Sequence, residues 1–405
     1  MSTGIFSTAG FTQDLAVKSF ASMITRLMPN GQAPLFGMTS MLPEETALQV
    51  EHGFFTKTML FPSLTLSALV ANATDTTFNV ASTTNVLPGM LMRAQSTGEI
   101  VIINQVLSTT QVLVGRGIGT TAGAIASAVP LYQVGNAFEE SSIRPNALQI
   151  NPVRITNFTQ IFRNTWALSG SAQATQVIAG ESTVAENRQD CAAFHAADIE
   201  KALFFGAKSQ STRNGQPFRT MDGLLNIVSN LSYYPPSYAA VNVYTAAATT
   251  SFTQLEAMLD PVFNQATDPK AGNQRVLFVG GQARKVINNI GRVNSTYFIN
   301  NGENSYGLQF GKFNIARGSF NMVEHPLFNS NSDWAKQAVA VDLSTFRTAY
   351  LGGRKTKKEE FNMAGQAVDN GIDAVGGTLT SELTCVVKNP PANAWIKDLT
   401  LAAQG

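Results

Sequence analysis

Hydrophobic and polar residues alternate in short runs in the second fifth of the chain, the pattern of half-buried strands. These runs occupy residues 78–80, 90–93, 99–106 and 111–114, and turn residues such as Pro88-Gly89 and Thr97-Gly98 separate them. Their spacing predicts a small β-barrel or sandwich over residues 72–136. On either side, residues 53–71 are predicted to form a strand broken at Pro62, and residues 137–180 return to extended structure.

The hydrophobic period then changes from two to about 3.6. Residues 183–207 are predicted to form the best helix of the chain, capped by Ser182 or Thr183, with Glu186 at the third position of a capping box. At 1.5 Å per residue this helix is about 35 Å long. Its apolar side is expected to comprise Val184, Cys191, Phe194, Ile199, Leu203 and Phe204.

Later segments combine strands with shorter helices. We expect a polar loop over 209–222 and irregular structure over 230–250. A helix over 252–265, capped by Ser251, precedes a buried strand over 274–279 and a helix over 282–290 that Gly291 ends, as in an α/β module. Further strands are predicted at 339–341, 345–351 and 378–387.

The first 50 residues have no predicted core of their own. Residues 14–28 form a short amphipathic stretch, which Pro29, Gly31 and Pro34 end, and residues 33–41 form a short apolar segment. Such an arm must pack on the body of the protein or on a neighbouring copy.

Composition adds an argument about surfaces. Only 14% of the 405 residues are charged, the formal net charge is +1, and 44% are hydrophobic. Neutral polar groups cost less to desolvate than unpaired charges, so low charge favours a chain that buries much surface against copies of itself. A neutral secreted β-protein remains an alternative. Near-neutrality argues against a dedicated nucleic-acid binder, which usually carries a basic patch.

Targeting and membrane signals are not evident. Lys18 and Arg26 interrupt the first apolar stretch, so no signal peptide is predicted, and the longest uncharged runs are rich in Gly, Thr, Ser and Pro. Cys191 and Cys385 do not make a disulfide framework and are expected to be inert core residues. The chain is therefore expected to be soluble and intracellular.

Candidate chemistry is sparse. His52, His195 and His325 lie far apart in sequence and none has metal-ligand spacing to another His or Cys. A proton relay of His195 with Asp190 and Asp198 is conceivable, but an exposed polar helix face is the favoured interpretation. Cys191 lies one helical turn from His195, yet its apolar neighbours favour packing over nucleophilic chemistry.

Two further stretches resemble phosphate-binding sites in composition. The glycine-rich run 115–119 lacks the lysine of a P-loop and has the wrong spacing for a dinucleotide fingerprint, so a turn in the β-module is expected. The basic cluster Arg354, Lys355, Lys357 and Lys358 is followed at once by Glu359 and Glu360. This self-neutralisation favours an exposed strand edge or an intersubunit ion-pair surface over a phosphate patch.

The order of these parts and two stretches carry a resemblance. Residues 97–107, 111–122 and 135–140 look like an inserted β-module, and residues 382–396 (ELTCVVKNPPANAWI) look like a C-terminal strand and tail. Together with the arm, extended hairpin, long helix and α/β module, they resemble the major capsid protein of tailed bacteriophages, the fold named after phage Hong Kong 97, in a subfamily with a β-module in the extended loop.

The resemblance implies an α+β capsid fold with five parts. These are an N-terminal arm (1–50), an extended loop with peripheral strands (51–180) that includes the barrel-like inserted module (72–136), a peripheral domain (181–232) with spine helix 183–207, an axial α/β domain (233–370), and a returning strand with a tail (371–405).

The implied function is that of a major capsid protein rather than an enzyme. Hexamers and pentamers would form an icosahedral shell around the double-stranded DNA genome, assembled in the host cytoplasm. Expected partners are further copies, a portal protein, scaffolding or decoration proteins and nonspecifically bound DNA, with no membrane, cofactor, metal or catalytic residue. The alternatives are an encapsulin-like bacterial nanocompartment shell, a neutral β-rich binding module and, third, an α/β hydrolase or transferase.

Overall fold

The computed structural model describes residues 33–57, 62–149, 151–175, 183–234, 238, 240–247, 250–264, 273–293, 300–305, 308–362 and 373–400. The chain forms two compact units. One comprises residues 55–153 and is called the inserted unit here. The other, called the main unit, is built from the flanking parts of the chain, up to Phe54 and from Arg154 onward. The predicted amphipathic stretch 14–28 lies outside the described residues.

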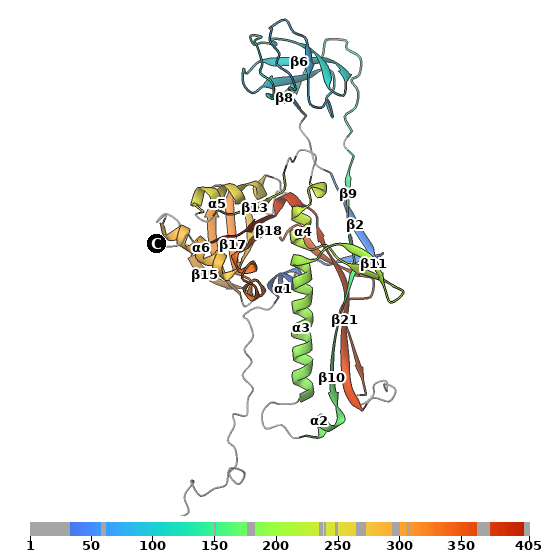
Figure 1. Ribbon diagram of the computed structural model, residues 1–405. Helices are drawn as coiled ribbons and strands as arrows, with labels where there is room; N and C mark the ends of the chain where they lie inside the picture. Colours follow the sequence, from blue (N-terminus) through green and yellow to red (C-terminus); the bar gives the residue numbers. More distant parts are fainter. Residues whose placement is uncertain are drawn as a thin grey trace, which may run out of the picture. The chain divides into compact units, whose positions relative to one another are not determined.

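The inserted unit is a six-stranded antiparallel sheet (Figure 1). The order is β3 (Ser63–Thr65), β8 (Pro130–Asn136), β5 (Met90–Ala94), β6 (Ile100–Ser108), β7 (Gln111–Gly115) and β4 (Thr77–Asn79). A bridge between Leu66 and Val80 joins its two ends. Alternate residues of these strands, such as Met92, Val101 and Leu131, form a buried apolar core. The predicted strands of this region are confirmed, because alternation alone specifies which face is buried.

The main unit contains the predicted long helix and a five-stranded sheet. The helix α3 runs from Thr183 to Phe205 and lies along β10 (Gln160–Ser169), with β21 (Ala374–Val387) beside it (Figure 1). β21 pairs with β10 along one edge and with β19 (Phe346–Leu351) and β20 (Lys357–Phe361) along the other. The apolar stripe of α3 packs with Phe162 of β10 into the core of this unit.

A seven-stranded mixed sheet forms the rest of the main unit. Its order is β13 (Val243–Thr245), β22 (Ala394–Lys397), β18 (Ala338–Val341), β14 (Gln274–Val279), β17 (Gly318–Glu324), β16 (Leu308–Ile315) and β15 (Asn300–Ser305). Helices α5 (Phe252–Leu259) and α6 (Gly281–Val293) accompany it (Figure 1). The expected capping box of Ser251 and Gln254 is confirmed.

Two helix ends differ from the prediction. The predicted helix 252–265 is α-helical only to Leu259 and continues as a 3₁₀ turn over Asp260–Phe263. Pro261 lacks the N–H that a further α-helical turn would need. Gly291 does not end the second helix, because α6 continues to Val293. Gly291 is buried within its last turn.

The predicted polar loop over 209–222 is wrong. Residues Ser209–Arg213 (β11) and Gln216–Thr220 (β12) form an antiparallel hairpin, which is called the 209–220 hairpin below. Its two turn residues, Asn214 and Gly215, have φ angles of 51° and 73°. Asn-Gly is the residue pair that most readily adopts two successive positive φ angles, as a two-residue hairpin turn requires.

The N-terminal apolar segment packs on the body of the protein. Residues Pro34–Thr39 form the short helix α1, and Leu35 and Met38 join the core beside α3. The strand β1 (Glu45–Ala47) then pairs in parallel with β19, and β2 (Glu51–Thr56) pairs with β9 (Val153–Phe158). Short helices α2 (Gly170–Ala174) and α4 (Leu224–Ser229) complete the main unit. None of the described helices has the length and apolarity to cross a membrane.

Candidate functional site

His195 is a structural residue and does not lie on an exposed helix face, so the favoured interpretation of it was wrong. Only 4% of its surface is exposed, and its Nδ1 and Nε2 lie 2.7 Å from Asn164 Oδ1 and 2.8 Å from Ser381 Oγ. Burial lowers the pKa of His195, although Asp198 nearby opposes this. With both ring nitrogens held by uncharged partners, this histidine fixes α3 to β10 and β21.

His325 forms a second buried network with Glu200 of α3, a pairing that no sequence pattern indicates. The Nε2 atom of His325 lies 2.7 Å from Glu200 Oε1. The same carboxylate accepts the backbone N–H groups of Leu35 at 2.9 Å and Phe36 at 2.7 Å. Glu200 thereby satisfies two of the free N–H groups at the start of α1 and ties this segment to α3.

The cysteines are packed as expected. Cys191 and Cys385 are both buried and unbridged, and burial raises the pKa of each thiol. The Sγ of Cys385 also donates a hydrogen bond to the carbonyl of Asp222 at 3.0 Å. Among the described residues no cluster of three or more His, Cys, Asp or Glu side chains is placed to hold a metal ion.

The glycine-rich run 115–119 is a turn, as predicted, and its arginine is used internally. Arg116 donates from Nε and Nη2 to the two carboxylate oxygens of Glu99 at 2.8 and 2.7 Å. The backbone N–H groups of Gly117 and Gly123 donate to the same carboxylate. Burial raises the pKa of Glu99, but these donors outweigh it and hold the pKa below its ordinary value.

The basic cluster is neutralised within the chain, which favours the strand-edge interpretation over a phosphate patch. Each of the four cations has a carboxylate partner within 2.7 Å, and the pairs are Arg354–Glu382, Lys355–Glu44, Lys357–Glu359 and Lys358–Glu360. Lys357 to Phe361 form β20, which hydrogen-bonds to β21 along one side.

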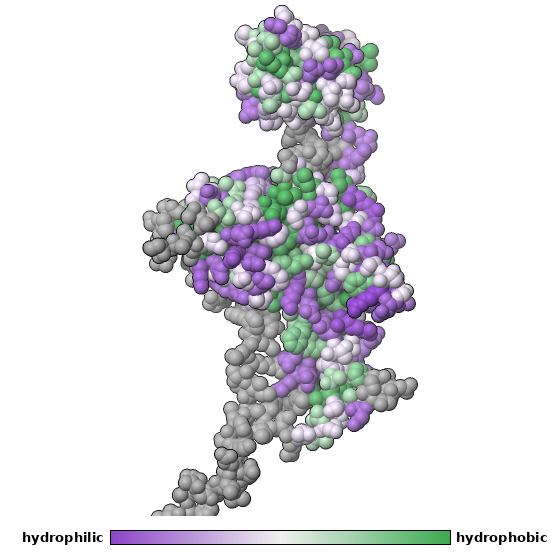
Figure 2. Space-filling model, viewed as in Figure 1, coloured by the Kyte–Doolittle hydropathy of each residue, from purple (hydrophilic) through white to green (hydrophobic). Residues whose placement is uncertain are grey.

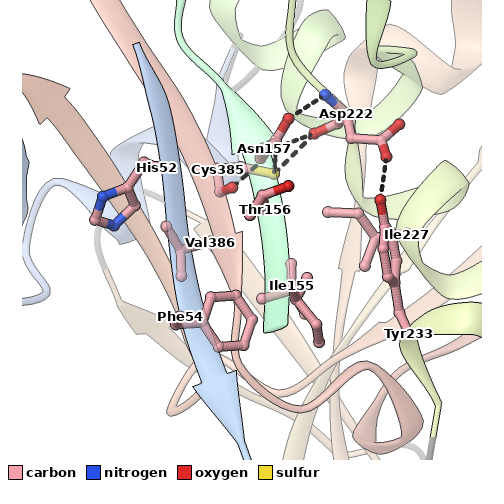
Figure 3. Close-up of a pocket in the computed structure, with 11 residues that line it drawn as sticks. His52, Phe54, Ile155, Thr156, Asn157, Asp222, Ile227, Tyr233, Cys385 and Val386 are labelled. Carbon is pink, nitrogen blue, oxygen red and sulfur yellow. Dashed lines mark hydrogen bonds between the residues drawn. The ribbon is translucent and has the colours of Figure 1, made fainter. Parts of the chain in front are cut away.

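A small pocket is lined by residues of β2, β9 and β21 and by Asp222, which follows the 209–220 hairpin (Figure 3). Figure 3 shows Asn157 and Cys385 turned toward the backbone of Asp222, and the hydroxyl of Tyr233 directed at the Asp222 carboxylate. Asn157 Nδ2 donates to the carbonyls of Asp222 and Cys385, both at 3.0 Å, and Asn157 Oδ1 accepts the Asp222 N–H at 2.7 Å. The enclosed space of this pocket is about 10 Å³, enough for about one water molecule. It is therefore too small for an organic ligand.

The same network holds both ends of the hairpin. On one side the N–H of Lys208 donates to Asp222 Oδ1 at 3.0 Å, and the Nζ of Lys208 donates to Thr156 at 2.8 Å. On the other side the N–H of Met221 donates to Gln160 Oε1 at 3.0 Å. The hairpin therefore leaves the main unit from a fixed base, although its own strands are almost entirely exposed.

Large apolar side chains are exposed at several places on both units. They include Leu48 (89% exposed), Ile143 (91%), Phe55 (68%) and Phe194 (65%). On the visible face of the inserted unit, hydrophobic residues are interspersed with hydrophilic ones (Figure 2). Phe194 was expected on the apolar side of the long helix, and that expectation was wrong.

Comparison with known proteins identifies the class. The major capsid protein of Pseudomonas phage PaMx41 is 36% identical over 416 residues, covering 99% of this chain and 97% of the relative. The sequence model of the SU10 major capsid protein family matches residues 4–400. Both matches extend over nearly the whole chain, so it is a phage major capsid protein. It belongs to the SU10 major capsid protein family.

Several solved structures are also similar. The capsid of the native GTA particle has 9% identity and a TM-score of 0.49, covering 99% of this chain and 100% of that one. A chain of Mycobacterium phage Bobi has 11% identity and a TM-score of 0.45, with 97% and 99% covered. The SrpI encapsulin of Synechococcus elongatus has 9% identity and a TM-score of 0.40, with 63% and 79% covered. The family assignment rests on the sequence matches, not on these likenesses.

Proposed function

We propose that this capsid protein assembles with copies of itself, as hexamers and pentamers, into a closed icosahedral shell around the double-stranded DNA genome of a tailed phage. The observation that carries the proposal is the match along nearly the full chain to a phage major capsid protein. The low charge and the exposed apolar side chains support it, because a shell subunit must bury surface on several neighbours.

The proposal extends to the role of each part. Residues 1–50 act as an arm and residues 51–180 as an extended loop, with the β-module within it, and both contact neighbouring copies. The helix predicted over 183–207 serves as the spine of a peripheral domain, residues 233–370 form an axial domain, and residues 371–405 return to the periphery. The anchoring of α1 by Glu200 supports the arm, since it gives residues 1–33 a fixed point of attachment.

Further partners follow from this role. A closed shell needs a portal protein for DNA entry, and scaffolding or decoration proteins are expected at its surfaces. DNA contact is nonspecific, in keeping with the net charge of +1. Assembly takes place in the host cytoplasm.

Nuclease protection separates this function from that of a nanocompartment shell. Particles are isolated from cells that carry the complete phage and treated with DNase before their contents are extracted. We expect genome-length DNA to survive inside them. Particles that hold a protein cargo and no nuclease-resistant DNA would contradict the proposal.

A further inference from the structure

Within the described part of the main unit the 209–220 hairpin contacts β10 only near the end of β12, and the rest of the hairpin is exposed. All five residues of β11 are exposed, and so are the first three of β12, including Phe218 at 40%. The two strands form a sheet of their own. An isolated two-stranded hairpin is only marginally stable in water, and a third strand or a packed face is normally needed. The hairpin is therefore expected to gain its partner from outside.

One edge and one face of the hairpin are better suited than the others to bind a partner. Pro217 in β12 has no N–H to donate, so β11 is the more suitable edge for an added strand. Cross-strand pairing places Phe218 opposite Ser211, and Arg213 opposite Gln216, so Phe218 and Arg213 lie on the same face.

Charge restricts the partner. Residues 209–220 contain Arg213 and Arg219 and no acidic residue. Within the described residues no ion pair involves either arginine, whereas Lys208 just outside the hairpin is hydrogen-bonded to Thr156. The partner surface should therefore be acidic and should carry an exposed apolar group for Phe218.

The segment 137–149 of the inserted unit has these properties. Every residue in it is exposed and none is in a helix or strand, which is unusual for a stretch of this length. Glu139 and Glu140 are adjacent, and no ion pair is found for either in the described part of the chain. Arg144 offsets one of the two charges. Ile143, at 91% exposure, is the most exposed large apolar residue of those described.

We propose that the 209–220 hairpin of one copy docks on segment 137–149 of a neighbouring copy. Arg213 and Phe218 share one face of the hairpin and meet the turn that carries Glu139 and Glu140, with Ile143 directly after it. Arg219 lies on the opposite face and meets the same acidic turn from the other side. The residues that follow the turn lie along the open edge of β11. The contact matches opposite charges and gives the hairpin the third strand that it lacks. This inference rests on the proposed function, because it assigns one intersubunit contact of the shell.

Charge exchange tests the pairing. The variants R213E/R219E and E139R/E140R each place like charges opposite one another, and each should lower the yield of shells about tenfold or more. The quadruple variant restores opposite charges and should return the yield to within about twofold of the original chain. R213K/R219K keeps the charge and serves as the matched control. Undiminished yield in either double variant, or no recovery in the quadruple variant, overturns the pairing.

Misfolding of the variants is checked separately. The three tryptophans, Trp166, Trp334 and Trp395, all lie in the main unit, so their fluorescence reports its unfolding. The urea midpoint of R213E/R219E should equal that of the original chain, since both arginines project from an anchored base.

A cross-link distinguishes a contact between copies from one within a chain. Shells of the R213C/E140C variant are oxidised mildly and run on a non-reducing gel, with each single cysteine variant as a control. Cys191 and Cys385 are buried and do not compete. We expect disulfide-linked dimers and larger multimers that neither single variant forms. A fast-migrating monomer, or the absence of a double-variant product, overturns the proposal. Failure of the unmodified chain to form shells would instead count against the proposed function.

Discussion

At the scale of single residues, the interior of each unit depends on a carboxylate that donors surround completely. Glu200 accepts two backbone N–H groups and faces His325 in the main unit. Glu99 accepts Arg116 and two backbone N–H groups in the inserted unit. Burying a carboxylate costs free energy unless its oxygens accept hydrogen bonds. Removing one member of such a network therefore leaves the remaining polar groups buried without a partner.

Replacing Glu200 by alanine should destabilise the main unit by about 3 kcal/mol, because two N–H groups of α1 and His325 lose their buried partner. Urea unfolding of the unassembled chain, followed by tryptophan fluorescence, measures this loss. Gln189→Ala, an exposed position on the same helix, is the control and should change the stability by less than about 0.5 kcal/mol. Equal effects of the two substitutions would show that Glu200 is not an anchor.

Glu99 gives the inserted unit a pH dependence. Its pKa in the folded unit lies below the ordinary value of 4.5, so its contribution is complete above that value and is lost as the pH falls through the folded pKa. At pH 7, Glu99→Gln should destabilise the unit by about 2 kcal/mol, and the difference should shrink below pH 4.5. Hydrogen exchange of β6 and β7 measures it, with exposed Glu139→Gln as the control. A difference that stays constant with pH would contradict this role.

At the scale of elements, local pattern predicted the strands and helices well and the buried polar contacts poorly. The strand 274–279 and the helix α3 follow from short-range periodicity, and the start of α5 follows from its capping box. The buried stripe of α3 runs through Cys191, His195, Ile199 and Leu203 at intervals of four. A histidine in such a stripe looks polar from the sequence, and its partners Asn164 and Ser381 are distant in sequence.

The 209–220 hairpin is an element that the local pattern failed to predict. Its Asn214-Gly215 turn is among the strongest local hairpin signals, but the flanking residues SQSTR and QPFRT lack alternating apolar positions. A strand pattern records burial within the chain, and this hairpin has almost none. Exposed strands need no apolar alternation, so this hairpin could be predicted only from its turn.

The N-terminal segment divides into two parts with different expected roles. Leu35 and Met38 belong to the core, so a deletion of residues 1–40 would damage folding as well as assembly. Deleting only residues 1–32 should lower the yield of shells about tenfold or more while the fluorescence-detected urea midpoint is unchanged. Electron microscopy and urea unfolding measure the two effects. Normal shells from this deletion would contradict the role of the arm.

At the scale of the whole molecule, the low charge and the membership of a capsid protein family both lead to the expectation that this chain assembles with copies of itself. Only 14% of the residues are charged, and large apolar side chains are exposed on both units. Each unit has its own buried core, so the chain can fold first and bury its remaining apolar surface on neighbouring copies.

Electron microscopy of the purified chain under assembly conditions tests this expectation most directly. The expected result is a population of closed shells tens of nanometres across, built from repeated copies of this one chain. A folded monomer that yields no particles over a range of protein concentration, salt and temperature, with and without lysate of phage-infected cells, would contradict the account.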